Sequence, residues 1–226
     1  MAANIQALYS ATSDLIGSGA DVRVKALKDG TLSVADFIAI MSLEGRVFSA
    51  EAGSATTPVT FGAGSIDTTE YDLKVLVPAG TSIIPVELNI VMETYGTTAL
   101  FEFMASIGQG STAAMGTDTD VTIYNVNLGH ANGSNCLAGA ASNNDGVYPT
   151  DNVVEFFRGT QAKAVTIATA DDDSTWQPEC FNWRVKEAGY LPILNGKGSL
   201  DVFAAAQAGT GFIMAKWIEI PSSWLS

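Results

Sequence analysis

The sequence contains little of what most enzyme active sites and nucleic-acid interfaces need. It has one histidine, His130, among 226 residues, which excludes most His-based triads and His-rich zinc sites. Its 11 basic residues are outnumbered by 24 acidic ones, for a formal net charge of −13. An acidic surface repels phosphates and anionic lipids, so we expect no nucleic-acid partner and no membrane partner. These absences favour a non-enzymatic protein without a cofactor or a metal ion.

Cysteine is scarce as well. Cys136 and Cys180 lie far apart and form no Cys-x-x-Cys motif. Free thiols are favoured over a single disulfide, because the N-terminal run MAANIQALYS lacks the basic and apolar regions of a secretory signal. No apolar run approaches the roughly 20 residues of a membrane-spanning helix. We therefore expect the chain to be made and folded in a cytoplasm.

The residues that are present predict an all-β protein. Hydrophobic residues make up 47% of the chain and charged residues 15%, the opposite of the balance in disordered chains. Short strand-like segments follow one another from Arg46 onward, with no alternating helices, which predicts an antiparallel β-sandwich of the jelly-roll type over residues 46–226 with roughly eight to ten strands. In addition to residues 81–107, the segments predicted to be strands are Val47–Ala52, Val59–Phe61, Tyr71–Val77, Val121–Val126, Val153–Arg158, Ala164–Thr169, Phe181–Val185, Tyr190–Leu194, Lys197–Ala205 and Gly211–Ile220.

Residues 81–107 carry the clearest strand pattern. Apolar and polar residues alternate with a period of two, as in a half-buried strand, on either side of Gly96. We predict two strands that form the central hairpin of the domain, and a second hairpin at Asn195-Gly196. The residues expected to face the core in the central pair are Val86, Leu88, Ile90, Met92, Phe101, Phe103, Ala105 and Ile107.

Residues 1–45 differ from the rest and are interpreted as an N-terminal arm, extended and in part helical. Ser33 followed by Asp36 resembles a capping box, and the run from Val34 to Leu43 predicts a short helix, with a strand as the alternative. Such an arm either docks on another chain or packs on its own domain, and the sequence favours neither. The residues predicted to contact a partner are Phe37, Ile38, Ile40, Met41, Leu43 and Trp224, the last of which follows the final strand.

Several segments could carry chemistry, but each has a simpler interpretation. The acidic run Asp171–Asp173 and the pair Asp118 and Asp120 lack the spacing of a calcium site and are interpreted as solvated loops. His130 and Cys136 could form a base and a nucleophile, but nothing marks a group to orient them, so structural roles are favoured. They lie in a Gly- and Asn-rich segment, residues 128–152, that is predicted to be one long loop. Trp183 and Trp217 are expected in the core.

Three stretches resemble a known group of proteins. The run Leu43–Ala50, the Gly- and Thr-rich link Gly53–Gly64 and the strand Ile83–Glu87 are similar to virion proteins encoded near the capsid genes of tailed bacteriophages, including head cement or decoration proteins. The resemblance covers about residues 40–110 and the ending WIEIP. It implies a jelly-roll-like domain, frequently a homotrimer, that binds the major capsid protein on the outer capsid surface of the virion and has no catalytic residues.

The alternative function is a carbohydrate- or receptor-binding module of a phage tail or spike, acting through the 128–152 segment or an exposed tryptophan. An enzyme such as a depolymerase ranks third, because it would need two acidic side chains paired in a cleft.

Overall fold

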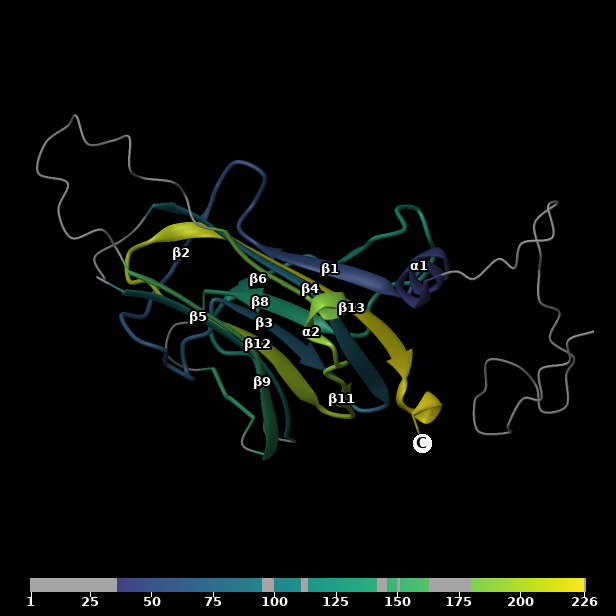
Figure 1. The fold of residues 1–226 in the computed structure, drawn as a ribbon. Helices are drawn as coiled ribbons and strands as arrows, with labels where there is room; N and C mark the ends of the chain where they lie inside the picture. The colour runs from purple at the N-terminus through teal and green to yellow at the C-terminus, as the bar shows by residue number, and fades with distance from the viewer. Residues whose placement is uncertain are drawn as a thin grey trace, which may run out of the picture.

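The fold is an all-β sandwich, as the strand pattern predicts. The structure, a computed structural model, describes residues 36–94, 100–110, 114–141, 146–149, 151–162 and 180–225. Within these residues a seven-stranded and a six-stranded antiparallel sheet pack face to face (Figure 1). The apolar faces of the two sheets meet and form the core.

The elements have the following bounds. The first sheet holds β1 (Val47–Ala52), β2 (Val59–Thr60), β4 (Thr81–Thr94), β7 (Tyr124–Asn125), β10 (Cys180–Arg184), β11 (Leu194–Asn195) and β13 (Thr210–Pro221). The second sheet holds β3 (Leu73–Val77), β5 (Leu100–Gln109), β6 (Thr119–Asp120), β8 (Leu137–Ala140), β9 (Asp151–Ala162) and β12 (Gly198–Ala205). The helices are α1 (Phe37–Leu43), α2 (Val185–Ala188) and the 3₁₀ turn η2 (Ser222–Trp224).

The strand order is that of a jelly roll. The four principal strands of the first sheet lie in the order β1-β13-β4-β10, and those of the second in the order β3-β12-β5-β9. Numbered along the chain, these eight strands run 1-8-3-6 and 2-7-4-5, which is the order that two Greek keys produce in a double-sheet jelly roll. Most of the connections between them therefore cross from one sheet to the other.

The two predicted hairpins are wrong, and the strand predicted over Tyr190–Leu194 is reduced to β11, which begins at Leu194. β4 and β5 lie in different sheets: β4 pairs with β13 and β10, and β5 pairs with β12 and β9. β11 and β12, on either side of Asn195-Gly196, are also in different sheets, although Gly196 has the positive φ of 90° expected of the turn. The alternation of apolar and polar residues shows which face of a strand is buried, but it does not show which strand lies beside it. Two strands have the same alternation whether they pair in one sheet or face each other across a sandwich.

The predicted core faces are correct over most of their length. Leu88, Ile90 and Met92 of β4 and Phe101, Phe103, Ala105 and Ile107 of β5 are all buried in one cluster, together with Trp183 and Trp217. A register shift in the pairing of β4 with β13, between Lys216 and Trp217, reverses the alternation, so that Ile83 joins this cluster and Val86 is only partly buried. A β-bulge of this kind inserts one residue and cannot be recognised from alternation alone.

The 128–152 segment is not one continuous loop. It contains β8, which pairs with β3 and β6, and β9 begins at Asp151. The strand predicted over residues 121–126 is reduced to β7, which pairs with β1. The sequence LAGA of β8 has little of the β-branched and aromatic character of a typical strand, and pairing with β3 decides its conformation. Predicted features at residues 1–35, Ala164–Thr169 and Asp171–Asp173 lie outside the described residues.

Candidate functional site

The predicted helix near the N-terminus is present as α1, at the end of the sandwich where the C-terminus also lies (Figure 1). It begins later than expected. Asp36 is the N-cap, its side chain accepting a hydrogen bond of 2.9 Å from the backbone N–H of Ile38, whereas the predicted cap Ser33 lies outside the described residues. Lys186 of α2 forms an ion pair with Asp36 and lowers the pKa of its carboxyl group.

The C-terminal end of α1 is fixed by glycine and by asparagines. Gly45 has φ +65° and closes a Schellman motif, in which the N–H of Arg46 donates to the carbonyl of Met41 at 2.9 Å. Three asparagine side chains from the end of β7 and the loop after it, residues 125–132, donate to the last carbonyls of this turn: Asn125 to Gly45 at 2.8 Å, Asn127 to Leu43 at 3.2 Å and Asn132 to Glu44 at 3.2 Å. These contacts satisfy acceptors that a helix leaves without partners and join the 125–132 loop to α1.

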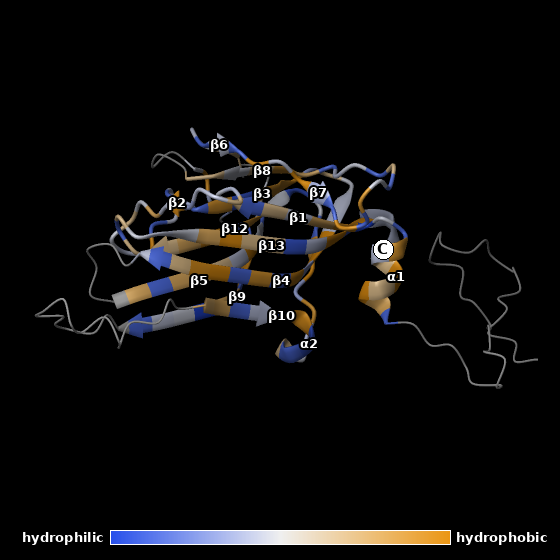
Figure 2. Cartoon of the chain, turned by 90° about the horizontal axis from the view of Figure 1, so that it is seen from above, coloured by the Kyte–Doolittle hydropathy of each residue, from blue (hydrophilic) through white to orange (hydrophobic). Residues whose placement is uncertain are grey.

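Exposed apolar side chains lie on both of these segments, at the same end of the sandwich. Phe37 (47% exposed), Ile40 (37%) and Leu43 (75%) lie on α1. Val126 (43%) and Leu128 (84%) lie on the 125–132 loop, which asparagine side chains hold against the end of α1. We call these five residues the apolar end. Figure 2 shows the apolar colour of α1 at the edge of the sandwich. An apolar cluster of this kind on a surface is typical of a binding site for another protein.

The other predicted contact residues face the domain itself. Met41 is 4% exposed and packs with Val47, Ile84, Ile218 and Ile220, and Ile38 packs against the same cluster. Trp224 is half-buried on this cluster, and the Arg46 guanidinium lies 4.3 Å from its ring centroid. One face of the helix therefore packs on its own domain, which is one of the two alternatives, and the other face is exposed to solvent.

A polar cleft of about 430 Å³ opens beside the apolar end. Arg46, Asn132, Asn135 and Glu219 contribute charged and amide groups to its lining. Trp224 stacks on Arg46 at 4.3 Å and adds an aromatic ring next to the cleft.

Glu219 in this cleft is 5% exposed, and three hydrogen bonds hold its carboxylate. Its carboxylate accepts hydrogen bonds from the indole N–H of Trp217 at 2.9 Å, the backbone N–H of Asn135 at 2.9 Å and the hydroxyl of Ser134. Burial and the nearby carboxylate raise the pKa of the Cys136 thiol, which therefore stays protonated and is a poor nucleophile.

His130 and Cys136 have different surroundings, which agrees with structural roles for both. The His130 ring lies against Gly45, where an added Cβ would be 2.2 Å from Nδ1, and Nδ1 accepts a hydrogen bond of 3.2 Å from the N–H of Asn132. Both cysteines are free thiols, as the sequence favours, Cys136 buried and Cys180 exposed.

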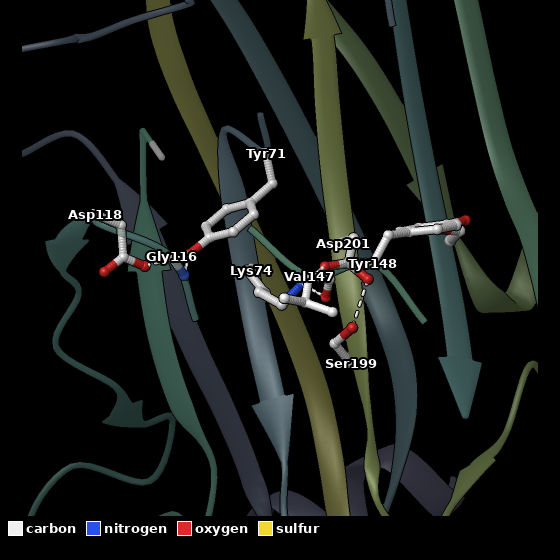
Figure 3. Close-up of polar contacts among 9 residues, drawn as sticks. Tyr71, Lys74, Gly116, Asp118, Val147, Tyr148, Ser199 and Asp201 are labelled. Carbon is white, nitrogen blue, oxygen red and sulfur yellow. Dashed lines mark hydrogen bonds and ion pairs between the residues drawn. The ribbon is translucent and has the colours of Figure 1, made fainter. Parts of the chain in front are cut away.

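The outer face of the second sheet buries a polar cluster that the sequence did not reveal. Lys74 of β3 and Asp201 of β12 are direct partners in register and form an ion pair of 2.6 Å between Nζ and Oδ1, with their side chains 1% and 0% exposed (Figure 3). Lys74 also donates to the carbonyl of Val147 at 3.0 Å, and the hydroxyl of Ser199 donates to Oδ2 of Asp201 at 2.6 Å. Asp72, which directly precedes β3, is also buried, and this raises the pKa of its carboxyl group to about 8.

Two tyrosines cover this cluster. The Tyr71 ring centroid lies 4.8 Å from Nζ of Lys74, and its hydroxyl donates to Asp118 at 2.6 Å (Figure 3). The Tyr148 hydroxyl lies 2.9 Å from the hydroxyl of Ser106, and its ring packs edge-on against Phe203. Asp118 thus has a structural partner in Tyr71. Within the described ranges, no group of three His, Cys, Asp or Glu side chains could hold a metal ion.

The comparisons with known proteins identify no relative: no protein-family model matches the chain, and neither does any curated protein. In the part of the chain that the structure describes, no helix is long and apolar enough to span a membrane.

Proposed function

We propose that the protein is a non-enzymatic structural protein of a phage virion, a cement or decoration protein that binds the outside of the head. Its partner is the major capsid protein, and its copies act as a homotrimer on the capsid surface. The observation that carries the proposal is the apolar end, where five exposed apolar side chains share one end of the sandwich.

The apolar end offers exposed apolar surface on a segment that hydrogen bonds already hold in place. Burying a leucine side chain contributes roughly 1.5–3 kcal/mol, so covering Leu43 and Leu128, which are 75% and 84% exposed, contributes roughly 2–5 kcal/mol. Because hydrogen bonds from Asn125 and Asn127 already hold the loop on α1, little order remains to be imposed on binding. The acidic charge of the chain suits a surface that faces solvent on the head.

The test is co-sedimentation of the purified protein with empty heads of its phage. Leu43→Asp and Leu128→Asp should each weaken attachment at least tenfold, because each places a charge in an apolar contact. Val154→Asp is the control, since Val154 is 47% exposed but lies on β9, at the edge of the second sheet. Attachment that all three variants retain would contradict docking through the apolar end. Light scattering of the free and capsid-bound protein measures the stoichiometry.

Deletion of residues 1–45, the simplest test of an arm, is unsuitable. It would remove Met41 together with the exposed residues and uncover Val47, Ile84 and Ile218 of the sandwich. Loss of attachment by that deletion would not separate a missing contact from a damaged domain. Point variants of the exposed residues avoid this problem.

The polar cleft favours a second candidate, a carbohydrate- or receptor-binding module of a tail or spike. Amide groups, an arginine and a flanking tryptophan are groups that bind sugar hydroxyls and stack on sugar rings. Jelly rolls occur in viral capsid proteins and in lectins, so the fold agrees with both candidates and does not choose between them. Saturable binding on a glycan array that Arg46→Ala abolishes and Arg184→Ala retains would favour this candidate over capsid docking.

A further inference from the structure

The buried pair of Lys74 and Asp201 has no role in docking, yet it is the most completely enclosed pair of charged groups among the described residues. The two residues are 127 positions apart in sequence and directly opposite each other on β3 and β12. Nζ of Lys74 lies 2.6 Å from Oδ1 of Asp201, which is within reach of the carboxyl carbon after a small rotation of either side chain.

The surroundings of the pair disfavour its charged form. Both side chains are at most 1% exposed, and transfer of an ammonium group and a carboxylate from water into such a site carries a large desolvation penalty. Burial raises the pKa of the Asp201 carboxyl group and so favours its protonated form. A proton that moves from Nζ to Oδ1 turns the pair into a neutral amine beside a neutral carboxylic acid, which are the reactants of amide formation.

We propose that Lys74 and Asp201 join in an intramolecular isopeptide bond that links β3 to β12. The lone pair of Nζ attacks the carboxyl carbon of Asp201, forming the C–N bond. The C–Oδ1 bond then breaks, and Oδ1 leaves as water with the two protons that Nζ gives up. No oxidant, reductant or second substrate is needed, since the ammonium and the carboxylate together equal one amide and one water.

The hydrogen-bond partners already present fit the product. The amide keeps one N–H, and the carbonyl of Val147, 3.0 Å from Nζ, is in place to accept it. Oδ2 remains as the amide oxygen, and the hydroxyl of Ser199, 2.6 Å away, is in place to donate to it. Two buried charges are replaced by a neutral group whose polar atoms are both satisfied (Figure 3). A bond that closes a loop of this length would also restrict the unfolded chain.

The test is the mass of the intact full-length protein under denaturing conditions. The wild-type chain should be lighter than its sequence by one water, and Lys74→Met, which keeps the volume but removes the amine, should have its full mass. A protease digest should contain one branched peptide in which the segments around Lys74 and Asp201 are joined. The branched peptide is decisive, because dehydration at Asp29-Gly30 would give the same change in mass without a branch.

Two results would overturn the proposal. One is a wild-type chain of full mass, both freshly purified and after long incubation in the folded state, which would leave a buried ion pair. The other is a loss of water that persists in Lys74→Met. If that variant fails to fold, the wild-type mass and digest still decide the question. None of these measurements involves capsids, so their outcome is independent of the proposed docking function.

Discussion

Two residues of the same helix should respond to substitution in opposite ways. Met41→Ala should destabilise the sandwich, whereas Leu43→Ala should leave its stability almost unchanged. Met41 is 4% exposed in a cluster with Val47, Ile84 and Ile218, and Leu43 is 75% exposed. Both substitutions replace one good helix former by a better one, so intrinsic helix propensity does not account for the expected difference.

The expected magnitude follows from burial. Truncation of a buried Met to Ala costs roughly 2–5 kcal/mol, and we expect about 2–3 kcal/mol here because the cluster lies at the edge of the domain and can partly collapse. For a chain of this size each kcal/mol lowers Tm by roughly 2–4 °C, which predicts a decrease of roughly 4–12 °C for Met41→Ala. Leu43→Ala should stay within about 0.5 kcal/mol of the wild type, as for most surface substitutions.

Urea unfolding monitored by tryptophan fluorescence measures both variants, since Trp217 and Trp183 lie in the core. An equal m-value with a lower midpoint for Met41→Ala would show a loss of stability without a change in the surface that unfolding exposes. A wild-type midpoint for Met41→Ala would refute the packing of α1 on the sandwich. At a temperature where both variants are folded, the order should reverse for attachment to heads, with Leu43→Ala the weaker binder.

Three further predictions concern other features of the structure. Gly45→Ala should lower the free energy of unfolding by about 1–3 kcal/mol, because it places a side chain at φ +65° with its Cβ 2.2 Å from Nδ1 of His130. Thermal unfolding should show partial recovery of stability in the double variant Gly45→Ala, His130→Ala, because the clash is removed and only the backbone strain remains. Burial raises the pKa of Asp72 from 3.8 to about 8. Between these two pH values the unfolded chain has released a proton that the folded chain keeps. The stability due to this group is therefore fully present below pH 3.8 and is lost as the pH rises through the folded pKa. Asp72→Asn should remove that loss. The free energies of unfolding of the variant and the wild type, measured with urea, should then diverge by up to about 1.4 kcal/mol per pH unit across the window. Equal pH profiles would contradict a protonated Asp72. A thiol reagent should label one cysteine, Cys180, in the folded protein and both after unfolding; labelling of Cys136 at the rate of Cys180 without urea would contradict its burial.

Part of the candidate site could be predicted from the sequence. Phe37, Ile40 and Leu43 stand out because α1 has more apolar residues than one helix face can bury, so some must be exposed. Val126 and Leu128 gave no such signal, since they fall in segments interpreted as a strand and a loop. Their place beside α1 depends on Asn125, Asn127 and Asn132, whose side chains reach the carbonyls of the helix end. An asparagine in a sequence does not indicate which distant carbonyl its amide will bind.

The sequence by itself determined the β class, a helix ending at Leu43 and most of the buried faces of β4 and β5, because burial leaves a local period that each segment carries alone. Only the tertiary structure decided which strands pair. It placed β4 beside β13 instead of β5, and Lys74 opposite Asp201 across 127 positions. Pairing is a property of the whole chain path: the same alternation fits a hairpin and a crossing between sheets, and the choice depends on how all eight principal strands share one core.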